Sequence, residues 1–283
     1  MARTTLIGGK TVLLNDPYLP SNNHFFSTGY ELEMQTIKAS WTKVDKSKNP
    51  LTPILYGPPG TGKTSMIIEL SRLLKKPLYI MHGHDGLLSD ELAGGGRPGD
   101  EKGKVEYFLS PITTAMNTGG IALFEEISKA NPRSLALLTS VLDGSNYMEN
   151  NLINEKIYAH PEFRFVCTAN SNELDLPEAI WSRLQPRIEM PLPTKHQIET
   201  ILMGYYEINQ EIKKLINLFW ILYYENSSCG TQPPSVRDIV LVFDYAEKIT
   251  AMNESKSQTL ETTNHGISER SLRLAFKTFF SKK

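Results

Sequence analysis

The chain has 283 residues, of which 40% are hydrophobic and 22% charged, an ordinary composition for a protein with a buried core. Thirty Lys and Arg residues against 31 Asp and Glu residues give a formal net charge of −1, so no overall positive field attracts nucleic acid or anionic lipid. Two cysteines, Cys167 and Cys229, without a CxxC pair exclude a disulfide framework and a cysteine-based zinc ribbon, and favour a reducing, cytoplasmic compartment.

The first fifty residues are polar and irregular, and one helix is expected among them, from Tyr30 to Trp41. Gly8, Gly9 and Lys10 interrupt the short apolar patch at the N-terminus, which therefore lacks the core of a signal peptide. We expect residues 1–50 to form an N-terminal extension.

From Pro53 onward, short apolar runs alternate with segments of helical spacing. The expected strands cover residues 54–56, 78–81, 121–124, 163–168 and 188–191. The expected helices cover residues 63–74 and lie near 133–142 and 177–184. Short buried strands alternating with helices predict an α/β fold of three layers, a parallel sheet with helices on both faces, over residues 51–193.

Beyond Pro193 no strand pattern is evident, and a small helical domain is expected over residues 194–283. Its helices are expected at 195–206, 208–224, 236–250 and 269–280. The most apolar run, 215–224, is about half as long as a membrane span, which favours a buried helix and no membrane insertion. Its aromatic residues have the spacing of a helix core rather than of a nucleic-acid stacking surface: Phe219, Trp220, Tyr223 and Tyr224.

A glycine-rich segment is the strongest signal in the chain. Residues 57–64, GPPGTGKT, match GxxxxGK[ST] between an apolar strand and a helix. Such a loop surrounds phosphate oxygens with backbone N–H groups, and the following helix presents its positive end to them. Lys63 is expected to reach the β- and γ-phosphates of ATP, and the Thr64 hydroxyl to ligate Mg²⁺. The expected nucleotide-binding residues are Gly57, Pro58, Pro59, Gly60, Thr61, Gly62, Lys63, Thr64 and Ser65.

Polar side chains end two further strands. Glu125 and Glu126 follow the apolar run 121–124, and Asn170 ends the strand that begins near 163. Because ligands bind beyond the carboxyl ends of parallel strands, these groups should face the phosphate loop. We expect Glu125 to help hold Mg²⁺, Glu126 to polarise the attacking water, and Asn170 to bond the γ-phosphate or that water. Alternatively, the acids begin a helix and Asn170 caps a turn.

The order of these parts resembles an AAA+ ATPase: GPPGTGKT, IALFEE, FVCTAN, an arginine-bearing helix and a helical lid. Residues 89–96 and 103–108 are similar to the SDL-G segment and hairpin insert of the MoxR-type branch. Residues 127–138 resemble its DEINRA-P…LL signature, and residues 176–179 read LPEA. The resemblance extends over about residues 50 to 250 and implies the AAA+ fold, with ATP and Mg²⁺ as cofactors.

The resemblance also implies roles for two arginines. Arg183 matches the arginine finger that is supplied to a neighbouring subunit, with Arg187 as the alternative. Arg237 matches the sensor arginine of the lid, and Arg270 has a similar local sequence. A guanidinium suits both roles because it is always charged and forks onto phosphate oxygens. Ser235 and Ser268, which precede the latter two arginines, could equally be helix N-caps.

Taken together, the resemblance implies ATP hydrolysis in a homo-oligomeric ring of six, coupled to remodelling or activation of a client protein. A client with a von Willebrand factor A-type domain fits this branch. One alternative is a nucleic-acid motor subunit of a restriction or defence system, against which the balanced charge argues. Another is a nucleotide-gated scaffold with slow or no hydrolysis, because Glu125 stands where the family has Asp and Mg²⁺ demands close geometry.

Two histidines flank Gly83 after the second expected strand, His82 and His84. They could share a metal ion, but no acidic or thiol partner recurs at a ligand-like spacing. A polar loop near the nucleotide is the favoured interpretation.

Overall fold

The computed structural model describes residues 3–19, 30–45, 49–99, 103–170, 174–206, 210–226, 234–254 and 267–280, without the side chains of residues 203, 204 and 254. They divide into two compact units. An α/β unit holds the described residues up to 58 and those of 63–190. A helical unit holds the described residues from 191 onward, together with residues 59–62.

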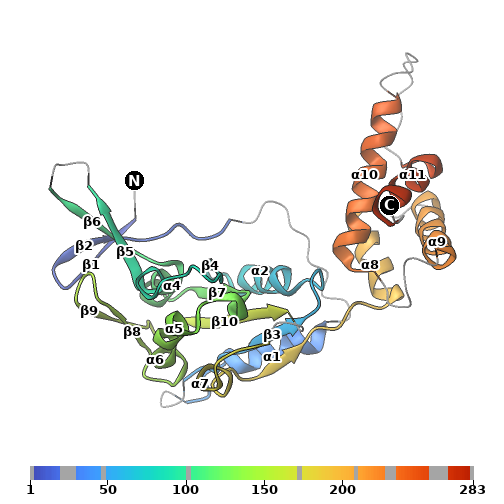
Figure 1. Cartoon of the computed structure of the whole chain (residues 1–283). Coiled ribbons are helices and arrows are strands. Elements are labelled where there is room, and N and C mark those ends of the chain that lie inside the picture. Colours follow the sequence, from blue (N-terminus) through green and yellow to red (C-terminus); the bar gives the residue numbers. More distant parts are fainter. Residues whose placement is uncertain are drawn as a thin grey trace. The chain divides into compact units, whose positions relative to one another are not determined.

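The α/β unit is built on a five-stranded sheet in the order β11-β3-β10-β7-β4 (Figure 1). Its strands are β3 (Ile54–Gly57), β4 (Leu78–His82), β7 (Ile121–Glu125), β10 (Arg164–Asn170) and β11 (Arg187–Glu189). All neighbours in this sheet run parallel. The first four residues of β7 and the first six of β10 are buried, as expected for strands covered on both faces. The predicted α/β fold class is confirmed, with every strand close to its expected place.

The helices of this unit are α1 (Glu31–Trp41), α2 (Lys63–Leu74), α3 (Ser89–Ala93), α4 (Pro111–Thr118), α5 (Pro132–Leu135), α6 (Thr139–Leu142) and α7 (Glu178–Trp181). The helix expected near 133–142 is divided by a 3₁₀ turn, η2 (Ala136–Leu138). A second 3₁₀ turn, η1 (Ile127–Lys129), follows β7. α4 is not among the helices expected from the sequence, although its end signals are plain: Ser110 caps it, Pro111 opens it and Gly119 ends it in the left-handed region.

The first fifty residues contain more than the single helix expected there. Two short strands, β1 (Thr4–Ile7) and β2 (Lys10–Leu13), form a hairpin. β2 also pairs in parallel with β6 (Val105–Leu109), which pairs antiparallel with β5 (Gly94–Pro98). The result is a second sheet in the order β1-β2-β6-β5. The N-terminal strands therefore belong to the α/β unit, and their pairing partner lies almost a hundred residues away in the chain.

A further hairpin, formed by β8 (Tyr147–Asn150) and β9 (Glu155–Tyr158), was not expected from the sequence. Asn150 organises its turn, because its Oδ1 accepts hydrogen bonds from the N–H groups of Leu152 and Ile153. Its Nδ2 donates to the carbonyl of Ala93 at the end of α3. Asn150 is buried, and these three bonds satisfy its side chain.

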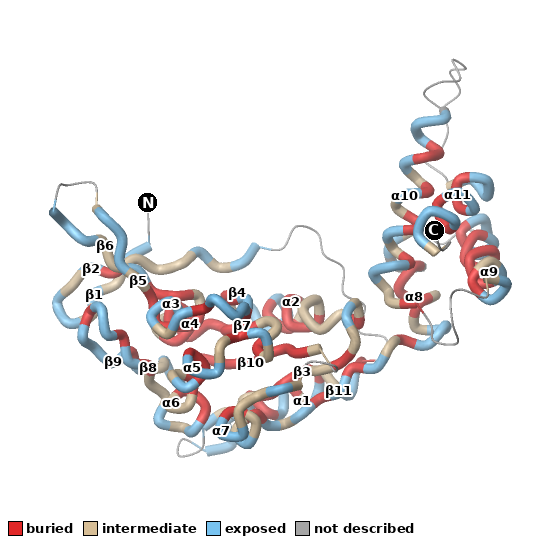
Figure 2. The backbone as a smooth tube through the Cα atoms, viewed as in Figure 1, coloured by how far each residue is buried: buried red, intermediate tan, exposed pale blue. Residues whose placement is uncertain are grey.

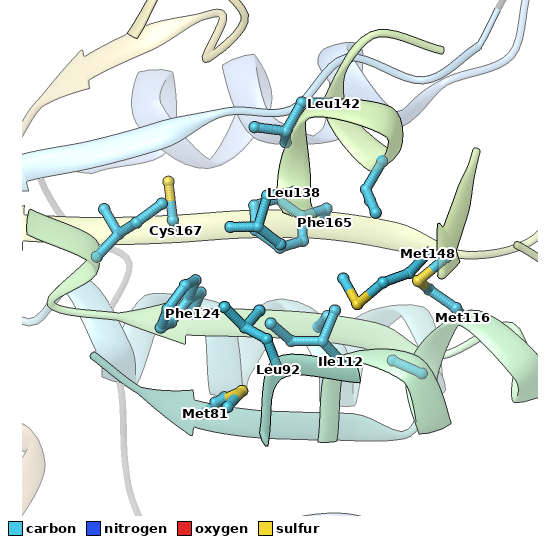
Figure 3. Close-up of a cluster of buried hydrophobic side chains, with 14 of the residues drawn as sticks. Met81, Leu92, Ile112, Met116, Phe124, Leu138, Leu142, Met148, Phe165 and Cys167 are labelled. Carbon is cyan, nitrogen blue, oxygen red and sulfur yellow. The ribbon is translucent and has the colours of Figure 1, made fainter. Parts of the chain in front are cut away.

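The core of the α/β unit lies between the large sheet and the segments that cover it (Figure 3). Phe124 of β7 and Phe165 of β10 occupy it with side chains from α3, α4, η2, α6 and β8: Leu92, Ile112, Met116, Leu138, Leu142 and Met148. Cys167 of β10 is fully buried, and burial raises the pKa of its thiol. The thiol therefore acts as a small apolar group of the core.

The helical unit contains α8 (Lys195–Tyr205), α9 (Gln210–Glu225), α10 (Val236–Glu254) and α11 (Glu269–Phe280), close to the four expected helices. Phe219, Trp220 and Tyr223 are buried in its core with residues of α10 and α11, as predicted. Figure 2 shows buried stretches, in red, along α9 and α10. The prediction is wrong for Tyr224, which is 68% exposed and stacks on Trp220 from outside. None of the helices in the described ranges is long and apolar enough to cross a membrane.

Candidate functional site

The loop that follows β3 has the backbone that its glycines predict. Gly60 and Gly62 have φ values of 79° and 89°, in the left-handed region that residues with a Cβ rarely adopt. Gly57 is needed for space instead, since a Cβ there would lie 2.1 Å from the carbonyl oxygen of Met190. The N–H of Met190 in turn donates a hydrogen bond to the backbone carbonyl of Tyr56. The chain after β11 therefore lies directly against the start of the loop.

Lys63 is the first residue of α2, and its ammonium turns back to the loop. Nζ donates to the carbonyl oxygens of Gly57 and Pro58, each at 2.8 Å. The positive charge thus lies beside the N-terminal end of α2, where the helix dipole also favours anions. Ser65, in the same turn, is half-buried. Loop, helix end and ammonium together form an anion-binding arrangement.

Four neighbouring strands of the large sheet end side by side near this loop. Asn170 at the end of β10 pairs in register with Gly57 at the end of β3. Glu125 at the end of β7 pairs in register with His82 at the end of β4. β10 lies between β3 and β7 in the sheet. The polar residues expected from separate segments of the sequence therefore lie along one edge.

Glu125 joins this edge to α2. One carboxylate oxygen, Oε1, accepts a hydrogen bond from the hydroxyl of Thr64. The other, Oε2, lies 2.9 Å from Nδ1 of His82. A hydroxyl beside a carboxylate fits Mg²⁺, which binds hard oxygen ligands, often one or two carboxylates together with phosphates. Among the described residues, no cluster of three or more His, Cys, Asp or Glu side chains could hold a metal by itself.

Glu126 has an unusual backbone and a different set of partners. Its φ and ψ of 52° and 43° lie in the left-handed region, which turns the chain from β7 into η1. Its N–H donates to the hydroxyl of Thr168 at 3.2 Å, and Oε2 lies 3.0 Å from Nζ of Lys129. The carboxylates of Glu125 and Glu126 therefore have separate partners. The left-handed turn at Glu126, which lies just beyond β7, accounts for this separation.

The two finger candidates have different surroundings. Arg183 follows α7 and is half-buried, and its Nη1 donates to the carbonyl of Ala179 at 2.7 Å. Its charge is also felt by Asp143, whose pKa is held below its ordinary value chiefly by hydrogen bonds from Ser145 and then by Arg183. Arg187 stacks on the ring of Trp181 at 4.0 Å and donates to its carbonyl at 2.9 Å.

The two lid candidates occupy equivalent positions. Arg237 and Arg270 are the second residues of α10 and α11, and both are exposed. The serine before each helix is an N-cap, as the alternative interpretation held: Ser235 Oγ accepts from the N–H of Asp238, and Ser268 Oγ from that of Ser271. The Ser235 hydroxyl also donates a hydrogen bond to the carboxylate of Asp238 at 2.7 Å.

Three residues of the site were missed as partners by sequence reasoning: His82, Lys129 and Thr168. Lys129 lies three residues after Glu126, a spacing that brings side chains together on a helical turn. His82 and Thr168 lie near the ends of β4 and β10, so only knowledge of the strand order could have placed them beside Glu125 and Glu126.

Comparisons with known proteins agree with this geometry. Residues 53–184 match the family model described as "AAA domain (dynein-related subfamily)". Protein YojN of Bacillus subtilis is 26% identical over 266 residues, which cover 90% of this chain and 86% of YojN. The denitrification regulatory protein NirQ of Pseudomonas aeruginosa is 25% identical over 181 residues, covering 63% of this chain and 66% of NirQ. Protein NorQ of Paracoccus denitrificans is 30% identical over 122 residues, covering 43% and 44%. The match thus spans less than two thirds of NirQ and of NorQ.

Proposed function

We propose that this protein is an AAA+ ATPase of the MoxR-type branch, which hydrolyses Mg²⁺-ATP to remodel or activate a partner protein. The observation that supports this most is the common edge formed by the ends of β3, β10, β7 and β4, with Thr64 and Glu125 in direct contact. In the proposal, this edge provides both an anion cradle and hard oxygen ligands for a metal.

The residues around the phosphates have distinct tasks in the proposal. Lys63 exchanges its loop carbonyls for phosphate oxygens and offsets the charge that develops during phosphoryl transfer. Thr64 and Glu125 would hold the metal, which when bound would neutralise charge on the phosphates. Because the longer Glu125 side chain reaches the Thr64 hydroxyl, the Glu-for-Asp replacement is compatible with a functional metal site.

Glu126 orients the attacking water and accepts its proton in the proposal. To do so, its carboxylate must give up its contact with Lys129 at 3.0 Å. Asn170, half-buried at the end of β10, offers an uncharged amide to the same water or to the γ-phosphate. A neutral group at that position adds no repulsion to the two carboxylates.

The arginines extend the proposal beyond one subunit. Arg183 serves the active site of the neighbouring copy in a ring of six identical subunits, because a guanidinium can bind phosphate oxygens in a bidentate manner. Arg237 couples the helical unit to bound nucleotide. The ring works in the cytoplasm. Its client is a protein, for which a von Willebrand factor A-type domain is the leading candidate, and one relative, NirQ, is named a regulatory protein.

The proposal is tested by the rate of ATP hydrolysis per subunit as a function of protein concentration, with mass measured in parallel in the presence of ATP. We expect the specific rate to rise as rings form, and to be lost in Glu126→Gln and Arg183→Ala. Mixing these two variants should restore part of the activity. An active site that keeps Glu126, on an Arg183→Ala subunit, can then receive Arg183 from a neighbouring Glu126→Gln subunit. A rate independent of concentration and of Arg183 would contradict shared active sites.

Added DNA or RNA and a client candidate distinguish the remaining functions. Strong stimulation by nucleic acid would favour a motor, whereas stimulation by a von Willebrand factor A-type protein would favour remodelling. ATP-driven assembly without turnover, even at high protein concentration, would favour a nucleotide-gated scaffold.

A further inference from the structure

The carboxylate of Glu125 is held from two sides. Oε1 contacts the Thr64 hydroxyl of α2, and Oε2 lies 2.9 Å from Nδ1 of His82 at the end of β4. The first contact is a hydrogen bond and the second is a close contact of an imidazole nitrogen with a carboxylate oxygen. Its orientation is therefore set jointly by the phosphate-loop helix and by a strand that contributes no residue to the loop.

The sheet builds the contact between His82 and Glu125. The two residues are directly paired in the parallel ladder of β4 and β7, so their side chains leave the sheet on the same face. Pairing continues one residue further, because the N–H of Gly83 donates to the carbonyl of Glu125 at 2.7 Å. A Cβ at Gly83 would lie 2.4 Å from the carbonyl oxygen of Glu126. Glycine at 83 thus lets the two strands stay together beyond His82.

A glutamate at this position needs such a restraint more than an aspartate does. Glu has one more rotatable bond, and ordering a longer side chain costs more conformational entropy. The Glu125 side chain is only 13% exposed, so its carboxylate has little access to water as an alternative partner. Carboxylates that ligate metals are usually fixed by hydrogen bonds from a second layer of residues. His82 is placed to restrain the carboxylate in this way, with Nδ1 2.9 Å from Oε2.

We propose that His82 is a positioning residue, which holds the Glu125 carboxylate beside Thr64 so that the two together can receive Mg²⁺. The inference rests on the proposed function, because the metal in question is that of Mg²⁺-ATP. His82 itself touches neither metal nor nucleotide in this arrangement. Its imidazole acts through the contact of Nδ1 with Oε2 at 2.9 Å, leaving Oε1 on the side of Thr64.

The test measures nucleotide binding rather than turnover. A fluorescent, slowly hydrolysed ATP analogue is bound to the full chain while MgCl₂ is titrated. We expect His82→Ala to raise the Mg²⁺ concentration at half-maximal binding about tenfold, at the lower end of the range for loss of such a partner, since His82 is 69% exposed. Binding without Mg²⁺ should be unchanged. His82→Asn, which places an N–H donor near the position of Nδ1, should restore most of the Mg²⁺ dependence.

Three further variants make the result specific. His84→Ala, in the same loop and also exposed, should leave the midpoint unchanged. Glu125→Gln should itself weaken the Mg²⁺ dependence, and adding His82→Ala to it should shift the midpoint less than twofold further, because the two residues act through one contact. Thermal unfolding of each variant in the absence of nucleotide shows that the fold is intact.

Two outcomes would overturn the inference while the proposed function stands: Mg²⁺-dependent binding that His82→Ala leaves unaltered, or a shift of equal size in the Glu125→Gln background. Failure of the unaltered protein to bind the analogue in an Mg²⁺-dependent manner would overturn both the inference and the proposed function.

Discussion

Replacing Lys129 with alanine is expected to raise ATP turnover, because Lys129 holds the carboxylate that is proposed to direct water. Nζ lies 3.0 Å from Oε2 of Glu126, and the pair spans one turn of η1. While this contact persists, one oxygen of the proposed general base is occupied by an ammonium. Its removal should increase the fraction of molecules in which Glu126 can reach water.

The size of the effect follows from the exposure of the pair. The Lys129 and Glu126 side chains are 42% and 44% exposed, so solvent screens their attraction. Exposed ion pairs contribute about 0.2–1 kcal/mol. Without the contact, the activation free energy should fall by that amount. Turnover should then rise by about 1.4- to 5-fold, since about 1.4 kcal/mol corresponds to a tenfold change in rate. The free energy of unfolding should fall by less than about 1 kcal/mol.

The assay is steady-state ATP hydrolysis at saturating Mg²⁺-ATP and at a protein concentration where the proposed rings are assembled. Lys129→Arg is the matched control, because it keeps a cation three residues from Glu126 and should leave the rate within about 1.4-fold of the unaltered value. A fall in turnover in Lys129→Ala, with KM and mass unchanged, would refute the reasoning. It would mean that Lys129 assists the reaction rather than restraining Glu126.

Other substitutions probe the fold and the site. Gly83→Ala should destabilise the protein by about 1–3 kcal/mol and weaken nucleotide binding, because its Cβ would meet the Glu126 carbonyl oxygen at 2.4 Å. Urea unfolding measures the loss of stability. Gly86→Ala is the near-neutral control, because a Cβ at Gly86 would meet only the His84 side chain. Phe124→Ala should lower the free energy of unfolding by about 3–5 kcal/mol, because the ring is fully buried between the sheet and its cover; a loss below about 1 kcal/mol would contradict this packing. Arg183→Ala should reduce ATP turnover by about 10³-fold if Arg183 acts as a finger. Arg187→Ala should keep most of its activity and lose about 0.5–1 kcal/mol of stability, because the stacking of Arg187 on Trp181 is lost. Equal losses of turnover in the two variants would argue against the assignment of Arg183.

Features that depend on neighbouring residues were readable from the sequence. The phosphate loop could be placed because glycines, Lys63 and Thr64 act within one strand–turn–helix unit whose geometry is local. The parallel sheet could be predicted from short, wholly apolar runs such as Ile121–Phe124, because a strand that is covered on both faces is apolar at every position. The helical unit followed from the 3.6-residue spacing of its apolar residues.

Some misjudgements have a common cause in side-chain direction and element length. Tyr224 fits the aromatic pattern of α9 but lies at the solvent-facing margin of the helix, next to Tyr223, which is buried. Strands β1, β2, β8 and β9 have four residues each, too few for an alternating pattern to stand out from a polar loop. Each is stabilised by a partner strand rather than by its own sequence.

By itself, then, the sequence determined the nucleotide loop, the α/β class, the helical unit and the acidic ends of β7, since these arise from local backbone preferences and hydrophobic periodicity. Only the tertiary structure decided which strand ends are neighbours. The order β3-β10-β7-β4 places Asn170 beside Gly57 and His82 beside Glu125. In the second sheet, the pairing of β2 with β6 joins Val12 of the first hairpin to Tyr107. The physical reason is that strand pairing joins residues far apart in the chain through backbone hydrogen bonds. Because nearly every residue type has the same backbone groups, the sequence does not indicate which strands pair.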